Sequence, residues 1–239
     1  MKIALIGYGK MGKAIEEIAI TRGHEIVLKV GIENLEDNTI ENIRRADVAI
    51  EFTGPESAWE NIRRCMDAGV PVVCGSTGWL QHLEEANDYC KKSGTAFLYA
   101  SNFSIGVNIF FAVNRQLARL MNNQDGYDVD ITEIHHTEKK DAPSGTAITL
   151  AQQIIENLSS KKKWVNQPTT EASELSIISE RKDPAPGTHT IRYHSDIDDI
   201  EITHTAHNRK GFAGGAVQAA EFIRNKKGIY HMNDVLGID

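Results

Sequence analysis

The residues best suited to chemistry lie between positions 133 and 147, in the stretch EIHHTEKKDAPSGTA. It brings together His135, His136 and Lys139, side chains that donate protons or hold anions. Proline, serine, glycine and threonine follow directly, just before the sequence becomes apolar at helical spacing. Because free N–H groups at the start of a helix attract anions, this stretch predicts a site for a negatively charged ligand with proton donors beside it.

A strand should present the two histidines. The stretch 127–136, YDVDITEIHH, alternates as a strand does, and it places Val129, Ile131, Glu133 and His135 on one face. His136 then points to the opposite side unless the strand ends between the two. We therefore expect one histidine to reach the reacting atom and the other to reach a different part of the ligand.

A helix should begin directly after this strand and its turn. Pro143 suits the first turn, and either Ser144 or Thr146 can cap it. The N–H groups of Gly145 and Thr146 would then point outward and, with the second histidine and the lysine, form a site for a carboxylate. The alternative is a solvated basic loop beside a well-capped helix.

A second motif stands at the N-terminus, where the apolar run Ile3–Ile6 leads into GYGKMG, a G-x-G-x-x-G pattern, and then into apolar residues at helical spacing. A second strand, EIVLKV, ends just before an acid about 20 residues past the last glycine. In dinucleotide-binding folds the glycines and the helix start hold the pyrophosphate, and this acid holds the ribose. The expected contacts are Gly7, Tyr8, Gly9, Lys10, Met11, Gly12 and Glu33.

Glu33 also bears on the choice of cofactor. A carboxylate at this position favours the free ribose hydroxyl of NADH and repels the extra phosphate of NADPH, and Asn34 beside it supplies no cation. We expect NADH to be favoured, with NADPH possible if Arg44, Arg45 or a lysine folds into reach.

Alternating strands and helices continue to about residue 104, and the strands end in small or polar residues at 53–54, 75–78 and 101–102. Ligands of open parallel sheets bind outside such strand ends, so these loops should line the cofactor. Beyond them, residues 105–121 read as a long amphipathic helix. The charged, proline-bearing segment 159–187 is expected to be a mobile surface loop.

Composition narrows the class of protein. The formal net charge of the 239 residues is -7, which argues against nucleic-acid binding, and no apolar run is long enough for a membrane span. Cys65, Cys74 and Cys90 form no CxxC pair, which is typical of a reduced, cytoplasmic protein. His204 and His207 form an H-x-x-H pair, but without a neighbouring cysteine or carboxylate pair we expect no metal.

The central stretch resembles the signature E-x-H-H-x-x-K-x-D-A-P-S-G-T-A of the 4-hydroxy-tetrahydrodipicolinate reductase (dihydrodipicolinate reductase) family. Further similarities follow in the same order along nearly the whole chain: EFTGPES, GSTGW, SNFSIGVN and EITHTAHNRKGFAGGAV. The resemblance implies a cytoplasmic oxidoreductase of lysine and diaminopimelate biosynthesis, which reduces a cyclic dicarboxylate with NAD(P)H.

The resemblance also implies roles for single residues. His135 would be the proton donor and Lys139 a second catalytic residue, while His136, Gly145 and Thr146 would bind substrate. Besides the glycine loop and Glu33, the cofactor contacts would be Gly75, Ser76, Thr77, Ala100, Ser101, Asn102 and Phe103. Apart from the resemblance, Arg209 is a candidate for holding substrate or a hinge, with a surface ion pair as the alternative.

The expected fold is α/β, with a Rossmann-like parallel-sheet dinucleotide-binding domain, residues 1–104 completed by 211–239. An α+β domain for substrate binding and oligomerisation should span residues 105–210. The glycine loop is one residue shorter than the family's common G-x-x-G-x-x-G form. The segment 187–206 also reads as compressed, as if the family's G-x-H-x-V-type strand were missing. Because the family forms a homotetramer through this sheet, a homo-oligomer is expected.

Two other functions remain open. The chain could be another NAD-dependent dehydrogenase that acts on imines or amines. It could also be a catalytically silent redox sensor that binds NADH and signals through a partner, although no basic recognition helix is visible.

Overall fold

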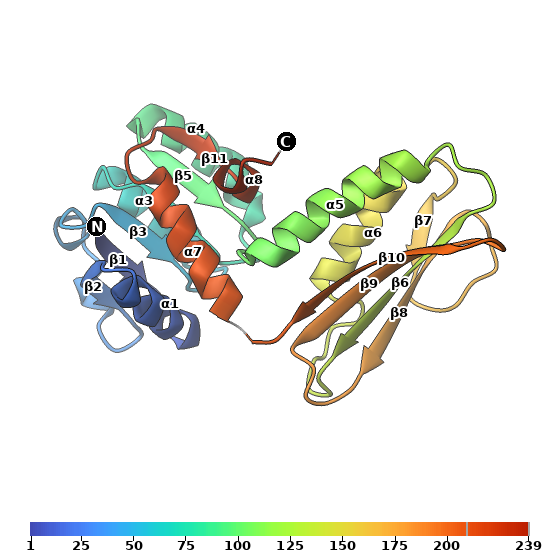
Figure 1. The fold of residues 1–239 in the computed structure, drawn as a ribbon. Helices are drawn as coiled ribbons and strands as arrows, with labels where there is room; N and C mark the ends of the chain where they lie inside the picture. Colours follow the sequence, from blue (N-terminus) through green and yellow to red (C-terminus); the bar gives the residue numbers. More distant parts are fainter. Residues whose placement is uncertain (209, 239) are drawn as a thin grey trace. The chain divides into compact units, whose positions relative to one another are not determined.

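The computed structural model describes residues 1–208 and 210–238, which form two compact units. The first contains residues 1–108 and the segment from residue 210 onward, and the second contains residues 109–208 (Figure 1). The first unit is therefore assembled from both ends of the chain.

A six-stranded parallel sheet forms the centre of the first unit, with the order β11-β5-β4-β3-β1-β2. Its strands start and end at β1 (Lys2–Ile6), β2 (Glu25–Val30), β3 (Val48–Glu51), β4 (Val72–Cys74), β5 (Ala96–Tyr99) and β11 (Gly228–Tyr230). Chain order reverses at β1, since β2 lies on one side of it and β3 on the other. The carboxyl ends beside such a switch point are where these sheets bind ligands.

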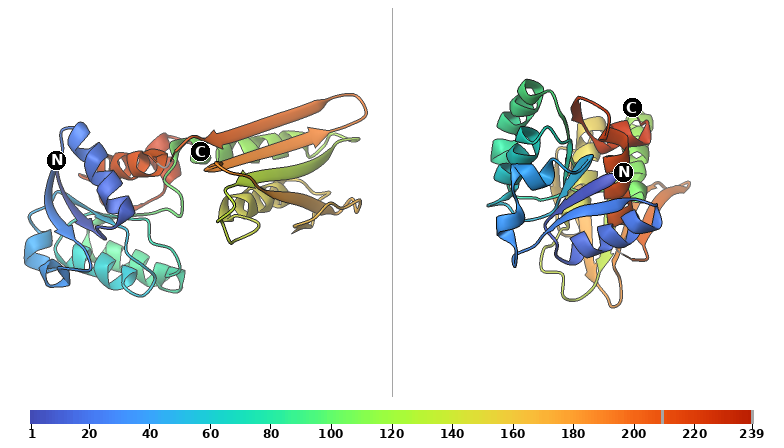
Figure 2. Two further views of the ribbon diagram at one scale, coloured as in Figure 1. Left: turned by 90° about the horizontal axis from the view of Figure 1, so that it is seen from below. Right: turned by 90° about the vertical axis from the view of Figure 1, so that its left-hand side faces the viewer.

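Helices cover both faces of this sheet (Figures 1 and 2). They are α1 (Lys10–Thr21), α2 (Ile40–Ile43), α3 (Ala58–Asp67), α4 (Leu83–Ser93), α7 (Lys210–Ile223) and α8 (Met232–Leu236), with short 3-10 turns at Leu35–Asp37 and Leu80–His82. Alternation along β1 explains the two layers. Ile3 and Leu5 pack with α1 and α7, whereas Ala4 and Ile6 pack with α3 and α4. Both faces are buried, so the strands read as continuous apolar runs.

A five-stranded mixed sheet with the order β10-β9-β6-β8-β7 forms the second unit. Its strands are β6 (Asp128–His135), β7 (Lys163–Val165), β8 (Glu174–Arg181), β9 (Gly187–His194) and β10 (Asp199–Ala206). β6 lies at the centre, antiparallel to β9 and parallel to β8. The strand that carries the histidines is therefore held by a neighbour on each side.

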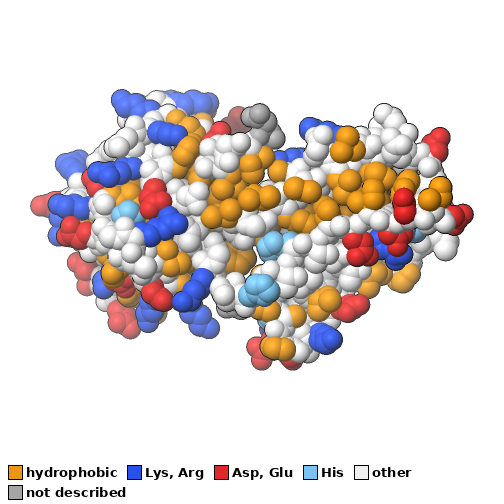
Figure 3. All heavy atoms as spheres, viewed as in Figure 1, with side chains coloured by type: hydrophobic (Ala, Val, Ile, Leu, Met, Phe, Trp, Pro, Cys, Tyr) orange, Lys and Arg blue, Asp and Glu red, His pale blue; other side chains and the backbone are white. Residues whose placement is uncertain are grey.

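Two helices, α5 (Ile105–Met121) and α6 (Gly145–Asn157), pack with this sheet. The core between them contains Val129 and Ile131 of β6 together with Leu150 and Ile154 of α6. Three large apolar residues of α5, Ile109, Val113 and Leu120, are 44–60% exposed. Figure 3 shows hydrophobic atoms along this helix. The predicted bounds of α5 are confirmed.

Three expectations were wrong. The segment 159–187 is not one long loop, because it contains β7 and β8, and β8 buries Leu175 and Ile177 against α6. The alternation in ELSIISER outweighs the charged and proline residues around it. The G-x-H strand is also present, since β9 begins Gly187-Thr188-His189 and pairs with both β6 and β10. Pro143 lies just before the N-cap of α6 rather than in its first turn.

No helix in the described part of the chain combines the length and the apolar character needed to cross a bilayer.

Candidate active site

The loop between β1 and α1 has the backbone geometry of a phosphate-binding turn. Gly7 has φ +100°, and a Cβ there would lie 2.0 Å from the backbone oxygen of Phe52. A Cβ on Gly12 would lie 2.4 Å from the Gly7 oxygen, so both positions require glycine for steric reasons. Gly9 is different, because a Cβ there meets nothing within 4 Å. Since the protein does not need glycine at Gly9, the open space above it fits a ligand lying against the backbone.

The start of α1 is available to an anion. Gly9 is the N-cap, no side chain caps the helix, and no acidic residue lies in the first turn. Unpaired N–H groups at such a position suit a pyrophosphate, so the chain's own residues fit the predicted cofactor. The Tyr8 hydroxyl donates to Glu16 rather than occupying the start of α1. The Glu16 carboxylate also lies 3.2 Å from the Lys29 ammonium.

Glu33 lies on the exposed turn that follows β2. Asn34 beside it is engaged locally: its amide donates to the Lys29 carbonyl and to Asp37. Arg45 donates instead to the carbonyls of Asn42 and Val27, and both Arg44 and Arg45 line a cavity where the strands of this sheet begin. Arg45, one of the cations that could have compensated a ribose phosphate, therefore already has hydrogen-bond partners in the protein.

The loops after β3 and β4 are joined by a buried carboxylate that sequence reasoning missed. Glu51 is fully buried and accepts hydrogen bonds from Thr53, Ser76 and the Cys74 thiol. Burial raises the pKa of Glu51, although these hydrogen bonds oppose the shift. At Gly75 a Cβ would lie 2.1 Å from the Phe52 ring, so this predicted cofactor loop is packed tightly against its neighbour.

The remaining predicted cofactor residues follow β4 and β5 at the same edge of the sheet: Gly75, Ser76, Thr77, Ala100, Ser101, Asn102 and Phe103. Phe103 is 2% exposed and its ring centroid lies 5.6 Å from that of Phe52. Its side chain is therefore part of the core, which leaves its backbone to reach a cofactor. Asn102 accepts from Ser104 N–H, which fixes the turn.

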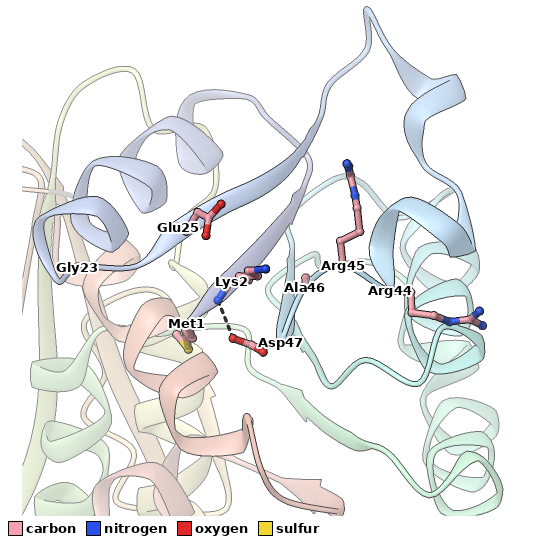
Figure 4. Close-up of a pocket in the computed structure, with 8 residues that line it drawn as sticks. All are labelled: Met1, Lys2, Gly23, Glu25, Arg44, Arg45, Ala46 and Asp47. Carbon is pink, nitrogen blue, oxygen red and sulfur yellow. Dashed lines mark hydrogen bonds between the residues drawn. The ribbon is translucent and has the colours of Figure 1, made fainter.

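An open cavity of about 410 Å³ lies at the opposite, amino-terminal edge of this sheet (Figure 4). Its lining residues are Met1, Lys2, Gly23, Glu25, Arg44, Arg45, Ala46 and Asp47. They lie where β1, β2 and β3 begin, and the Lys2 N–H donates to Asp47 at 2.7 Å. Because ligands of parallel sheets bind at the carboxyl ends, we do not assign the cofactor to this cavity.

In the second unit the end of β6 and the start of α6 meet at Ser144. Its hydroxyl caps α6 by accepting from Ala147 N–H at 3.2 Å, and its own N–H donates to Glu133. Of the two predicted caps, Ser144 is the one observed. Gly145 and Thr146 follow as the first residues of the helix, where backbone N–H groups lack helical partners. The carboxylate site predicted there remains a prediction.

Glu133 lies at the centre of this site although it is buried. It accepts from Ser144 N–H at 3.0 Å and from the Ser179 hydroxyl at 2.8 Å. Burial alone would raise its pKa, but the His189 ring, Ser144 and Ser179 outweigh burial and lower the pKa to about 2. Glu133 is therefore an anion throughout the physiological pH range.

His135 is 7% exposed and lies beside Glu133, with Nδ1 3.5 Å from the carboxylate. Burial lowers the pKa of His135 to about 4, because the favourable charge of Glu133 is offset by His189, Lys139 and Arg181. The ring is thus neutral at pH 7 in the ligand-free protein. A histidine that donates protons near neutral pH needs additional negative charge, which an anionic ligand would supply.

Lys139 lies in the loop after β6, and its ammonium contacts both carboxylate oxygens of Asp141 at 2.8 Å. Arg181 of β8 ties this loop down through the carbonyls of Lys139 and Asp141. His136 is half-buried and its carbonyl accepts from Lys139 N–H at 3.2 Å. The loop that carries Lys139 is therefore fixed at both ends. A substrate carboxylate could replace Asp141 as the partner of the lysine.

Sequence reasoning assigned no role to Glu133, His189 or Gly187. His189 is the third residue of β9, its Nε2 lies 3.6 Å from Glu133, and its ring is edge-on to His135 with centroids 5.1 Å apart. A Cβ on Gly187 would lie 3.1 Å from Nε2 of His135, so the glycine leaves that nitrogen room. The G-x-H pattern at the start of β9 could have identified Gly187 and His189, but this strand was predicted to be missing.

Within residues 1–208 and 210–238, the candidate metal cluster is Glu133, His135 and His189, whose ligand atoms lie within 4.8 Å of one another. Hydrogen bonds from Ser144 and Ser179 already engage the carboxylate. His204 is not part of this cluster, and its ring packs 5.9 Å from that of Phe110. Arg209, a candidate for substrate binding or a hinge, lies outside the described residues.

Comparisons with known proteins agree along the chain. Residues 1–103 match the family model "Dihydrodipicolinate reductase, N-terminus", and residues 106–236 match "Dihydrodipicolinate reductase, C-terminus". A 4-hydroxy-tetrahydrodipicolinate reductase of Christiangramia forsetii is 52% identical over 99% of this chain and 98% of its own length. The reductase of the same name from Neisseria meningitidis serogroup B is 33% identical over 94% of this chain and 84% of its own.

Among solved structures, a dipicolinate-bound dihydrodipicolinate reductase from Paenisporosarcina sp. TG-14 superposes with a TM-score of 0.77. The two sequences are 24% identical, and the match covers 97% of each chain. This likeness confirms the α/β fold predicted from the sequence.

Proposed function

The chain belongs to the dihydrodipicolinate reductase family, and we propose that it reduces 4-hydroxy-tetrahydrodipicolinate to tetrahydrodipicolinate in the diaminopimelate route to lysine. The observation that carries the proposal is the arrangement at the end of β6, where His135, Lys139 and the start of α6 combine a proton donor with places for anions. A cyclic dicarboxylate has two groups to hold and one carbon to protonate, which matches this set of residues.

The first unit is proposed to bind the nicotinamide cofactor at the carboxyl ends of its strands. Support comes from the uncapped start of α1 and from the open space at Gly9. NADH is favoured over NADPH, because Glu33 would repel a ribose phosphate and the Arg45 guanidinium is already engaged by the Val27 carbonyl. Ser76 and the backbone of Phe103 belong to the loops that would complete this site.

The cofactor supplies a hydride when it is bound. Loss of the 4-hydroxyl group as water turns the substrate into an α,β-unsaturated imine. The hydride would add to the carbon that lost the hydroxyl and leave an enamine, whose neighbouring ring carbon would take a proton from His135. Lys139 would leave Asp141 to hold a substrate carboxylate and stabilise negative charge, while keeping its own proton. His136 and the N–H groups of Gly145 and Thr146 would hold the second carboxylate.

Substrate charge would prepare the proton donor. The pKa of His135 is about 4 in the ligand-free protein because the ring is buried among Lys139, Arg181 and His189. A dicarboxylate placed against Lys139 neutralises the positive charge that opposes protonation, so the pKa of His135 should rise when substrate binds. The donor would then be charged mainly when there is something to protonate.

We also propose that the protein works as a homo-oligomer in the cytoplasm. Its three cysteines are free thiols, as expected in a reducing compartment. The mixed sheet of the second unit ends in β10, an edge strand whose residue Ile200 is 38% exposed and available to a second copy. Light scattering after size exclusion would measure the oligomeric state.

The activity is tested by supplying freshly generated 4-hydroxy-tetrahydrodipicolinate to the purified protein and following loss of NADH absorbance, then repeating the assay with NADPH. Oxidation that requires this substrate supports the proposal. A redox sensor would bind NADH without oxidising it, and a dehydrogenase for other imines would oxidise NADH with a different cyclic or open-chain imine while leaving this one unchanged.

A further inference from the structure

We propose that Glu133 and His189 are positioning residues for the proton donor: Glu133 orients His135 and supplies the negative charge that keeps it protonated in the complex, and His189 opposes that charge. The inference rests on the proposed reduction, in which His135 gives up a proton. Neither Glu133 nor His189 would touch the substrate's reacting carbon. Both would act through the imidazole of His135.

Glu133 is held in place before any ligand arrives. Its side chain is 0% exposed, Ser144 N–H contacts both carboxylate oxygens at 3.0 and 3.2 Å, and Ser179 donates at 2.8 Å. The strands on both sides of β6 therefore fix the carboxylate: Ser179 comes from β8 and His189 from β9. Because this anion is buried and held in a fixed position, it acts more strongly on neighbouring groups than a solvated charge would.

Both histidines approach the same oxygen of this carboxylate. Nδ1 of His135 lies 3.5 Å from Glu133 Oε2, and Nε2 of His189 lies 3.6 Å from it. Nδ1 of His135 is buried and has no hydrogen-bond partner in the described structure. Glu133 lies close enough that a small movement of the ring on ligand binding would bring the pair into hydrogen-bond range.

The orientation of His135 follows from this geometry. An ionised Glu133 favours the N–H on Nδ1, which leaves Nε2 as the nitrogen that exchanges its proton with a ligand. Nε2 faces Gly187, where a Cβ would lie only 3.1 Å away, so the absence of a side chain keeps this nitrogen uncrowded. His189 Nε2 is also 3.1 Å from the Ser144 hydroxyl, which links it to the cap of α6.

Each element packed against His135 contributes a charged side chain that changes the proton affinity of its ring. Glu133 of β6 favours the protonated ring, whereas His189 of β9, Arg181 of β8 and Lys139 of the following loop oppose it. Removing Glu133's charge and removing His189 must therefore move the proton affinity of His135 in opposite directions. A purely structural role for the two residues would not produce shifts of opposite sign.

The test is the pH profile of kcat for Glu133→Gln and His189→Asn. For Glu133→Gln, the pH above which kcat falls should move down by about one unit or more, and kcat at pH 7 should fall about ten- to a hundredfold. The KM for NADH should not change. For His189→Asn the pH above which kcat falls should move up by about half a unit. Glu133→Asp keeps the charge and should restore most of the wild-type limit.

Matched controls make the same chemical changes nearby but outside the cluster. Glu180→Gln removes an exposed carboxylate from β8, and His194→Asn removes a partly exposed imidazole from β9. Both should leave the pH profile at its wild-type position. Unshifted limits in Glu133→Gln and His189→Asn, or shifts in the same direction, would overturn the inference.

Imidazole NMR of the ligand-free protein separates this inference from the proposed reaction. In the absence of any substrate, the pKa of His135 should rise in His189→Asn and stay at its wild-type value in His194→Asn. If the wild type fails to oxidise NADH with the proposed substrate but this shift is seen, the proposed function fails and the electrostatic coupling stands. If turnover is normal and the shift is missing, the coupling fails alone.

Discussion

Dicarboxylate binding should make the protein take up a proton at His135. The pKa of the ring is about 4 without a ligand, so the fraction protonated near neutral pH is very small. A carboxylate about 4 Å away, at an effective dielectric constant of about 20, stabilises the imidazolium by about 4 kcal/mol. That free energy corresponds to about 3 pKa units, which brings the pKa of His135 to about 7 in the complex.

Calorimetry of dipicolinate binding in buffers of different ionisation enthalpy measures this uptake. Binding to the wild type should take up about 0.9 proton near pH 6 and about 0.1 near pH 8, as a pKa of about 7 requires. Uptake by other groups cancels in the difference between the wild type and His135→Gln. His194→Gln, the same change at a partly exposed histidine, should behave as the wild type. Equal uptake by wild type and His135→Gln near pH 6 would refute the reasoning.

The remaining predictions concern stability, the glycine loop and the cofactor. The folded-state pKa of His135, about 4, lies below its ordinary value, so the unfolded chain takes up the proton first as pH falls. The free energy of unfolding should therefore drop by about 2 to 3 kcal/mol between about pH 7.5 and 4.5. Urea unfolding of His135→Gln should lack that part of the drop; Glu133, with a pKa of about 2, contributes a separate loss at lower pH. Gly7→Ala should destabilise the protein by about 1 to 3 kcal/mol, since its Cβ would lie 2.0 Å from a backbone oxygen at φ +100°. Gly9→Ala should unfold like the wild type but bind NADH more weakly in a fluorescence titration, and wild-type affinity would remove Gly9 from the cofactor site. Glu33→Ala should weaken NADH about tenfold and NADPH little, as measured by KM; equal losses would mean that the ribose lies elsewhere.

The fold of the first unit was largely predictable because its signals are local. The glycine pattern and apolar runs predict β1, α1 and β2, and α5 has the expected bounds. In the second unit β8 was missed because charged residues and prolines surround it, although Leu175 and Ile177 alternate as strand residues do. Burial of these two side chains against α6 decides the structure, and that contact is not local in sequence.

In the candidate site, too, the features that depend on contacts between distant parts of the sequence could not be predicted. His135, Lys139 and the start of α6 come from one continuous stretch, so their type and spacing could be read directly. His189 approaches Glu133 only because β9 pairs with β6 in a register that sets Glu133 opposite His189. The low pKa of His135 depends on burial and on charges from three other elements, which no single stretch of sequence contains.

The measurement that tests the central claim most directly is the single-turnover rate of NADH oxidation with 4-hydroxy-tetrahydrodipicolinate, for the wild type and for His135→Ala. We predict oxidation by the wild type, a loss of about two to four powers of ten in His135→Ala, and unchanged NADH affinity. Wild-type turnover by His135→Ala would contradict the role of His135. No turnover by the wild type, with NADH bound, would contradict the reaction itself.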